Sequence, residues 1–158
     1  MSRLRLQRTV SRWTLRHGID PVGLVLDSTV FIAAERQGMN VHETLAGIAT
    51  RFPAEQFAVS VITVAELAHG AARADSPQRA AMRRRYLDEL MAAAPVYPVT
   101  VSIALLAGQI DGESTARGVR LPVSDLLIGV TALELGYKIA TTNVRHFQAI
   151  PGLEIESF

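Results

Sequence analysis

Three acidic residues and one amide stand at similar places along the chain, next to apolar segments typical of buried strands. Asp27 directly follows the apolar run 22–26, and Asn143 follows a second such run. Glu66 and Asp125 lie near the starts of apolar helical patterns. Because open α/β sheets form their ligand sites at the carboxyl ends of the strands, we expect all four side chains to converge within a few ångströms. Carboxylate and amide oxygens suit hard cations, so the set predicts a site for Mg²⁺ or Mn²⁺.

Helix capping is an alternative explanation for each of these residues taken singly. Asp27 and Asp125 could be N-caps, Thr63 and Glu66 have the spacing of a capping box, and Asn143 could cap a turn. Capping does not explain why the acids have apolar neighbours on both sides, which implies little exposure. Several acids in such a low-dielectric cleft repel one another, and a divalent cation relieves that repulsion. Taken together, the four residues therefore favour the metal site.

The elements that would position these residues alternate between strands and helices. The predicted strands span 22–26, 57–60, 96–100, 138–141 and 153–156. The predicted helices span 28–36, 41–51, 62–73, 77–93, 102–117 and 124–136. Such alternation requires crossover connections, which predicts an α/β fold with a mostly parallel central sheet and helices on both faces.

The composition of the chain limits the classes of protein to which it can belong. The chain has 158 residues, of which 49% are hydrophobic and 20% are charged, as expected for one compact domain. It contains no cysteine, which excludes disulfides, thiolate zinc sites and a cysteine nucleophile, and which suits a cytoplasmic protein. No apolar run approaches the roughly 18 residues of a membrane-spanning helix, so we expect no membrane association.

Charge is distributed unevenly along the chain. Residues 1–22 contain five arginines and one aspartate, whereas residues 23–158 carry a small excess of acids. We therefore predict a basic N-terminal extension over 1–22 and a single domain over 23–158. A solvated extension is the simpler interpretation of the arginines, and contact with nucleic acid is the alternative.

Four ordered segments carry a resemblance to a known family. They are 24–32 (LVLDSTVFI), 59–70 (VSVITVAELAHG), 124–132 (SDLLIGVTA) and 140–153 (ATTNVRHFQAIPGL). Together they resemble PIN-domain ribonucleases, specifically the VapC-type toxins of bacterial toxin–antitoxin pairs. The resemblance runs from about residue 23 to the C-terminus. It implies the PIN fold, in which a mostly parallel sheet lies between layers of helices.

The resemblance also implies an activity and assigns roles to residues. The expected activity is metal-dependent endoribonuclease cleavage that leaves 3′-hydroxyl and 5′-phosphate ends. The positions matching the catalytic, metal-holding acids are Asp27, Glu66 and Asp125. The supporting positions are Thr29 and Asn143, and the positions expected to contact substrate are Ser28, Arg145 and His146. Many relatives carry a further acid just after the position of Asn143, but 144–147 contains none. The resemblance therefore implies one firmly held ion and leaves a second ion open.

The expected partners are an RNA substrate, a small cognate antitoxin protein and a second copy of the chain in a cytoplasmic homodimer. Two alternatives stay open. One is a metal-free ribonuclease that uses His69 and His146 as an acid–base pair. The other is a non-catalytic PIN-fold module that binds RNA or protein. Other α/β classes lack support, because the glycine-rich dinucleotide motif is absent, and Thr29 occupies the place where a haloacid-dehalogenase-type phosphatase needs its second aspartate.

Overall fold

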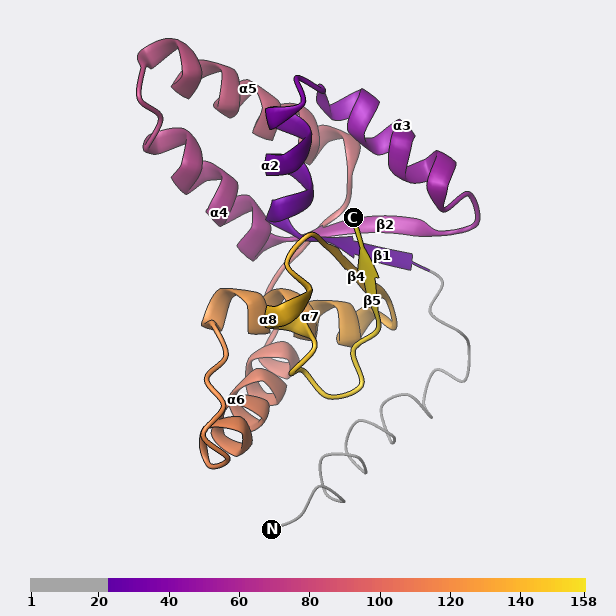
Figure 1. The fold of residues 1–158 in the computed structure, drawn as a ribbon, viewed down its shortest axis with the longest axis vertical. Coiled ribbons are helices and arrows are strands. Elements are labelled where there is room, and N and C mark those ends of the chain that lie inside the picture. Colours follow the sequence, from indigo (N-terminus) through magenta and orange to yellow (C-terminus); the bar gives the residue numbers. More distant parts are fainter. Residues whose placement is uncertain (1–22) are drawn as a thin grey trace.

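The computed structural model describes residues 23–158, and a five-stranded sheet forms its centre (Figure 1). The strands lie in the order β3-β2-β1-β4-β5, and every neighbouring pair is parallel. Their bounds are β1 Gly23–Leu26, β2 Gln56–Ser60, β3 Val96–Tyr97, β4 Lys138–Thr141 and β5 Ile155–Ser157. The predicted α/β class is confirmed. The predicted extension 1–22 lies outside the described residues.

Helices cover both faces of the sheet. They are α2 Ser28–Arg36, α3 Val41–Arg51, α4 Val61–Ala72, α5 Pro77–Ala93, α6 Val101–Thr115, α7 Val123–Leu135 and α8 Val144–Phe147. Figure 1 shows α2 to α5 above the sheet and α6 to α8 below it. Two hydrophobic clusters fill the layers because successive strand residues point to opposite faces. In β1, Val25 joins the cluster beneath α6 and α7, whereas Leu24 and Leu26 join the cluster beneath α2 and α3.

Apart from shifts of one or two residues at the ends of β2, α4, α6 and α7, the predicted elements differ from the observed ones at three places. The strand predicted over 96–100 ends at Tyr97, because Pro98 has no N–H group with which to continue the ladder. The last strand lies slightly later than predicted, over Ile155–Ser157. The single-turn helix α8 was not predicted, since four residues are too short to show a helical period. None of the described helices has the length and apolar character needed to cross a membrane.

The register of β1 and β4 sets the position of the predicted site. Leu26 pairs with Ala140, and the N–H of Asp27 donates a hydrogen bond to the carbonyl of Ala140 at 3.0 Å. Helix α2 then begins at Ser28, so Asp27 is the junction between the central strand and a helix. Thr141, the last residue of β4, is thereby brought beside Asp27, although the two residues are 114 positions apart in the sequence.

Candidate active site

Asp27 is a buried carboxylate with one unsatisfied oxygen. Asp27 is only 1% exposed. Its Oδ2 accepts hydrogen bonds from the hydroxyls of Thr29 at 2.7 Å and Thr141 at 2.8 Å. Oδ1 is equally buried but has no hydrogen-bond partner. The side chain does not cap α2, which removes the capping explanation for this residue. A buried oxygen without a partner is costly in free energy, so Oδ1 is suited to receive a ligand.

The two threonines that hold Asp27 are themselves oriented by the backbone. The N–H of Thr142 donates to Thr29 Oγ1 at 3.0 Å, and the N–H of Asn143 donates to Thr141 Oγ1 at 2.9 Å. Each hydroxyl oxygen therefore accepts a backbone hydrogen bond while its own proton points at Asp27. Thr141 was not among the predicted site residues. The only indication of its role in the sequence is that its hydroxyl lies at the carboxyl end of an apolar strand.

Glu66 lies in the second turn of α4 and is bound to the residue after Asp27. The hydroxyl of Ser28 donates to Glu66 Oε2 at 2.5 Å. The capping-box alternative is wrong, because the helix begins after Ser60, whose side chain caps it by accepting from the N–H of Ile62. Thr63 is instead fully buried, with its hydroxyl 3.4 Å from the carbonyl oxygen of Leu26. Ser28, expected to contact substrate, here holds Glu66.

Asp125 lies in the first turn of α7 and faces α8. Its side chain is 15% exposed, and its Oδ2 lies 2.6 Å from Nδ1 of His146. Burial raises the pKa of the Asp125 carboxyl above its ordinary value, the hydrogen bond from His146 opposes this rise, and the charges of Asp27 and Glu66 add to it. Helix α7 has no side-chain cap, so Asp125 is not a capping residue. The charges of the other two predicted acids therefore act on Asp125.

Each of the three acids is bound to a neighbouring hydroxyl or imidazole. Within residues 23–158, no three acidic or histidine side chains form a ready-made metal cluster, and the convergence of the four predicted side chains stays a prediction. The oxygen-rich set still fits a hard divalent ion, because the buried Oδ1 of Asp27 is unsatisfied and the charges on the other acids need neutralising.

The remaining predicted residues lie at the rim of the site. Asn143 directly precedes α8, and its amide nitrogen lies 2.8 Å from His146 Nδ1. Arg145 is exposed on the same helix. His69 is exposed in the last turn of α4, and in the described part of the chain it makes no hydrogen bond or ion pair with His146. Within the described residues, His69 and His146, the pair required by the metal-free alternative, are therefore not in direct contact.

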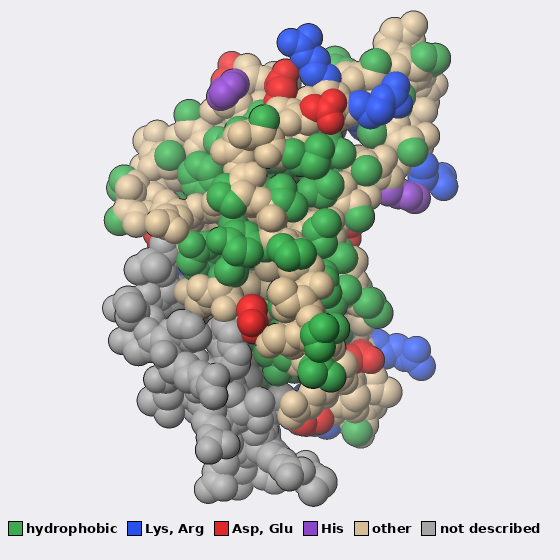
Figure 2. Space-filling view, turned by 180° about the vertical axis from the view of Figure 1, so that it is seen from behind, with side chains coloured by type: hydrophobic (Ala, Val, Ile, Leu, Met, Phe, Trp, Pro, Cys, Tyr) green, Lys and Arg blue, Asp and Glu red, His purple; other side chains and the backbone are tan. Residues whose placement is uncertain are grey.

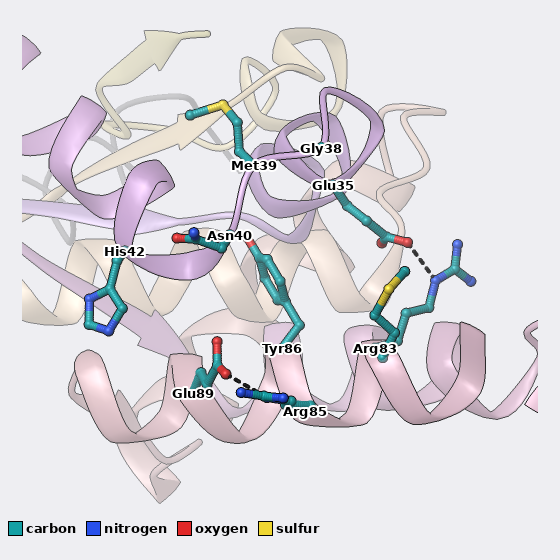
Figure 3. A pocket seen from close by; sticks show the side chains of 10 residues that line it. Glu35, Gly38, Met39, Asn40, His42, Arg83, Arg85, Tyr86 and Glu89 are labelled. Carbon is teal, nitrogen blue, oxygen red and sulfur yellow. Dashed lines mark hydrogen bonds and ion pairs between the residues drawn. The ribbon is translucent and has the colours of Figure 1, made fainter. Parts of the chain in front are cut away.

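A groove that the sequence did not predict leads away from Glu66. Its inner part, a hollow of about 210 Å³ between α2, α4 and α5, includes Glu66 and Arg83. The outer part, of about 660 Å³, shares Glu35, Arg83 and Tyr86 with the inner part and continues to the start of α3 (Figure 3). Arg83 Nε pairs with Glu35 Oε1 at 2.8 Å, and Nη1 donates to the carbonyl of Gly70 at 3.0 Å. This arginine lies between the two hollows and ties α5 to α2 and α4.

The fold and the site together define a class of protein, namely α/β domains with a parallel sheet and an acidic, oxygen-rich site at the carboxyl edge of that sheet. The PIN domain family matches residues 24–153, and the chain belongs to that family. Ribonuclease VapC1 from Rickettsia felis is 23% identical over 134 residues, which cover 85% of this chain and 95% of the relative. The tRNA(fMet)-specific endonuclease VapC from Salmonella typhimurium is 29% identical over 100 residues, which cover 63% and 74%.

Solved structures share the fold. VapBC2 from Rickettsia felis, bound to a DNA fragment from its promoter, matches with a TM-score of 0.71 and 19% identity, over 85% of this chain and 98% of that chain. VapBC-5 from Mycobacterium tuberculosis, a member of the VapBC family of toxin–antitoxin systems, matches with a TM-score of 0.67 and 25% identity, over 87% and 100%. The predicted PIN fold is therefore confirmed.

Proposed function

We propose that this protein is a divalent-metal-dependent endoribonuclease and the toxin of a toxin–antitoxin pair. The observation that carries the proposal is the buried Oδ1 of Asp27, which has no hydrogen-bond partner. The charges of Asp27 and Glu66 also act on the Asp125 carboxyl. The names of the curated relatives support ribonuclease activity, and the toxin–antitoxin systems among the matched structures support the toxin role.

Asp27, Glu66 and Asp125 would hold Mg²⁺ or Mn²⁺, with Asn143 in support. The bound ion would lower the pKa of a water molecule and neutralise charge on the scissile phosphate, so that hydrolysis leaves 3′-hydroxyl and 5′-phosphate ends. The residues around the site contribute to this step by holding the acidic side chains in fixed orientations. Thr29 and Thr141 fix Asp27 through Oδ2 and leave Oδ1 available.

Other residues would orient the second acid and the substrate. Ser28 fixes Glu66 through a single hydroxyl, which sets the direction of that carboxylate toward the site. Arg145 is exposed at the rim and can neutralise a phosphate of the RNA on either side of the cleaved bond.

We assign the groove along α2, α4 and α5 to the antitoxin. The inner hollow reaches Glu66, so a chain bound there would block the acids, and a basic side chain would be drawn to their charge. Matched VapBC structures support a cognate partner of this kind. We place the pair in the cytoplasm.

We also propose a homodimer. Large apolar side chains are exposed at the starts of α4, α6 and α7, namely Val61, Val101, Leu105 and Val123. Figure 2 shows hydrophobic side chains gathered across the middle of one face of the molecule. Such a patch favours protein association.

The proposal is tested by incubating total bacterial RNA with the purified protein in Mg²⁺ or Mn²⁺, with EDTA as the metal-free condition. Asp125→Asn should abolish cleavage, whereas Asp88→Asn, the same change at an exposed position on α5, should leave it intact. End-mapping should find 5′-phosphates. Cleavage that persists in EDTA and leaves cyclic phosphates would support the histidine-pair alternative. RNA binding without cleavage in either metal would support the non-catalytic module.

A further inference from the structure

The amino edge of the sheet carries a group of partly buried charges that has no part in the proposed cleavage. Lys138 is the first residue of β4, and its Nζ lies 3.1 Å from Oε1 of Glu55 and 3.1 Å from Oε1 of Glu156. The side chains of Glu55 and Lys138 are only 17% and 20% exposed. Two carboxylates therefore share one ammonium, which leaves the group one positive charge short.

The other carboxylate oxygen of Glu55 has no partner. This atom, Oε2, is buried and accepts no hydrogen bond from the described residues. Arg51 is close in the sequence but is engaged elsewhere. Its Nη2 donates to the carbonyl of Ser157 at 2.8 Å, and its guanidinium lies 4.7 Å from the centre of the Phe158 ring. Because a buried carboxylate oxygen without a partner is costly in free energy, a cationic donor is expected beside Glu55.

The strand register shows which part of the chain is attached next to this group. Gly23, the first residue of β1, pairs with Gln56, which directly follows Glu55. On the other side of β1, Leu24 pairs with Lys138. The 22 residues that precede Gly23 are therefore joined to the domain beside the unsatisfied carboxylate.

The segment before Gly23 has the complementary charge. Residues 1–22 contain five arginines and one aspartate, and the arginine nearest to the domain is Arg16. The stretch from Arg16 to Gly23 spans up to about 23 Å when extended, which is enough to reach Glu55. A guanidinium suits a buried carboxylate oxygen, because its planar donors form charge-assisted hydrogen bonds.

We propose that the segment 12–22 docks on the amino edge of the sheet, with the Arg16 guanidinium bound to Oε2 of Glu55 and the Trp13 ring against Phe158. The Phe158 ring follows two residues after Glu156 and is 36% exposed, so it offers an apolar surface near the carboxylates. Docking would satisfy the buried oxygen and supply the missing positive charge. The inference is independent of the proposed nuclease, because none of these residues belongs to the acidic site.

The test uses Trp13 as the probe, since it is the only tryptophan of the chain. In the full-length protein without RNA, its fluorescence should resist quenching by acrylamide, in contrast to the urea-unfolded chain. Glu55→Gln and Arg16→Gln should each shift the equilibrium about tenfold toward the undocked form, and the double variant should add little. Arg5→Gln and Glu113→Gln, whose carboxylate makes an exposed hydrogen bond within α6, are the matched controls and should quench like wild type.

Three results would overturn the proposal. The first is a Trp13 as accessible to acrylamide in the folded protein as in urea. The second is a protected Trp13 that neither Glu55→Gln nor Arg16→Gln exposes, which would place the segment elsewhere. The third is protection that arises only when a single-stranded RNA oligonucleotide is added, which would assign the segment to nucleic acid. Circular dichroism of each variant establishes that an exposed Trp13 does not come from unfolding of the domain.

Discussion

Replacing Thr141 with valine should weaken both the fold and the site through a single lost hydroxyl. Valine has nearly the same shape, so little packing changes at this fully buried position. The variant loses the hydrogen bond to Asp27 Oδ2 and the acceptor for the N–H of Asn143. Of the Asp27 partners only Thr29 would remain. A hydrogen bond to a buried charge contributes about 1.5–3 kcal/mol, so we expect a loss of about 2–3 kcal/mol in the free energy of unfolding.

The assay is urea unfolding of the metal-free protein at neutral pH, together with thermal unfolding. A loss of this size corresponds to a decrease in Tm of about 4–12 °C for a domain of this length. Thr141→Ser should restore most of the stability because it restores the hydroxyl. Thr50→Val is the matched control, since the Thr50 hydroxyl only donates to the carbonyl of Ala46 on an exposed helix face.

A double-mutant cycle with Asp27→Asn isolates the interaction itself. If the hydroxyl acts through the carboxylate charge, Thr141→Val should cost clearly less when position 27 is already neutral. Equal costs in both backgrounds, or a Thr141→Val protein as stable as wild type, would refute the reasoning that Thr141 supports the buried charge.

Three further results are expected. The raised pKa of Asp125 means that its protonated form is favoured in the fold, so its contribution to stability is present at low pH and is lost as pH rises above the ordinary aspartate value. Asp125→Asn should therefore be increasingly more stable than wild type as pH rises, measured by unfolding in EDTA at several pH values; a constant difference would contradict this. Ser28→Ala frees Glu66 and should lower kcat/KM for RNA about tenfold, with a smaller decrease in Tm than Thr141→Val because this hydrogen bond is only partly buried; unchanged kinetics would remove Ser28 from the site. Arg51→Ala loses the stacking on Phe158 and should cost about 1 kcal/mol in unfolding while cleavage stays normal; reduced cleavage would link this edge to the site.

The sequence predicted the parts of the fold that depend on local pattern. The apolar run before Asp27 indicated a buried strand, and glycine or proline residues near the ends of several of the long helices indicated where these elements stop. Gly136, for example, ends α7 with a φ of 66°, which only glycine adopts easily. The strand over 96–100 was predicted too long because apolar character outweighed the missing N–H of Pro98.

The details of the site could not be predicted in the same way. Which hydroxyl reaches Asp27 depends on β4 lying next to β1 in one particular register, and no local pattern specifies the neighbour of a strand. The contact between Asp125 and His146 likewise depends on how α8 packs on α7. The acids themselves could be named from the sequence because buried carboxylates at strand and helix junctions need a specific reason to be there.

The central position of β1 determines when, during synthesis of the chain, the site around Asp27 can form. The first acid emerges early, at position 27, but its partner Thr141 is made 114 residues later. A ribosome that adds roughly 5–20 residues per second needs about 6–23 s to cover that distance. Until then β1 has no β4 beside it, and Asp27 lacks the hydroxyl and backbone groups that hold it. A nascent chain therefore acquires the groups that orient Asp27 only when it is almost complete.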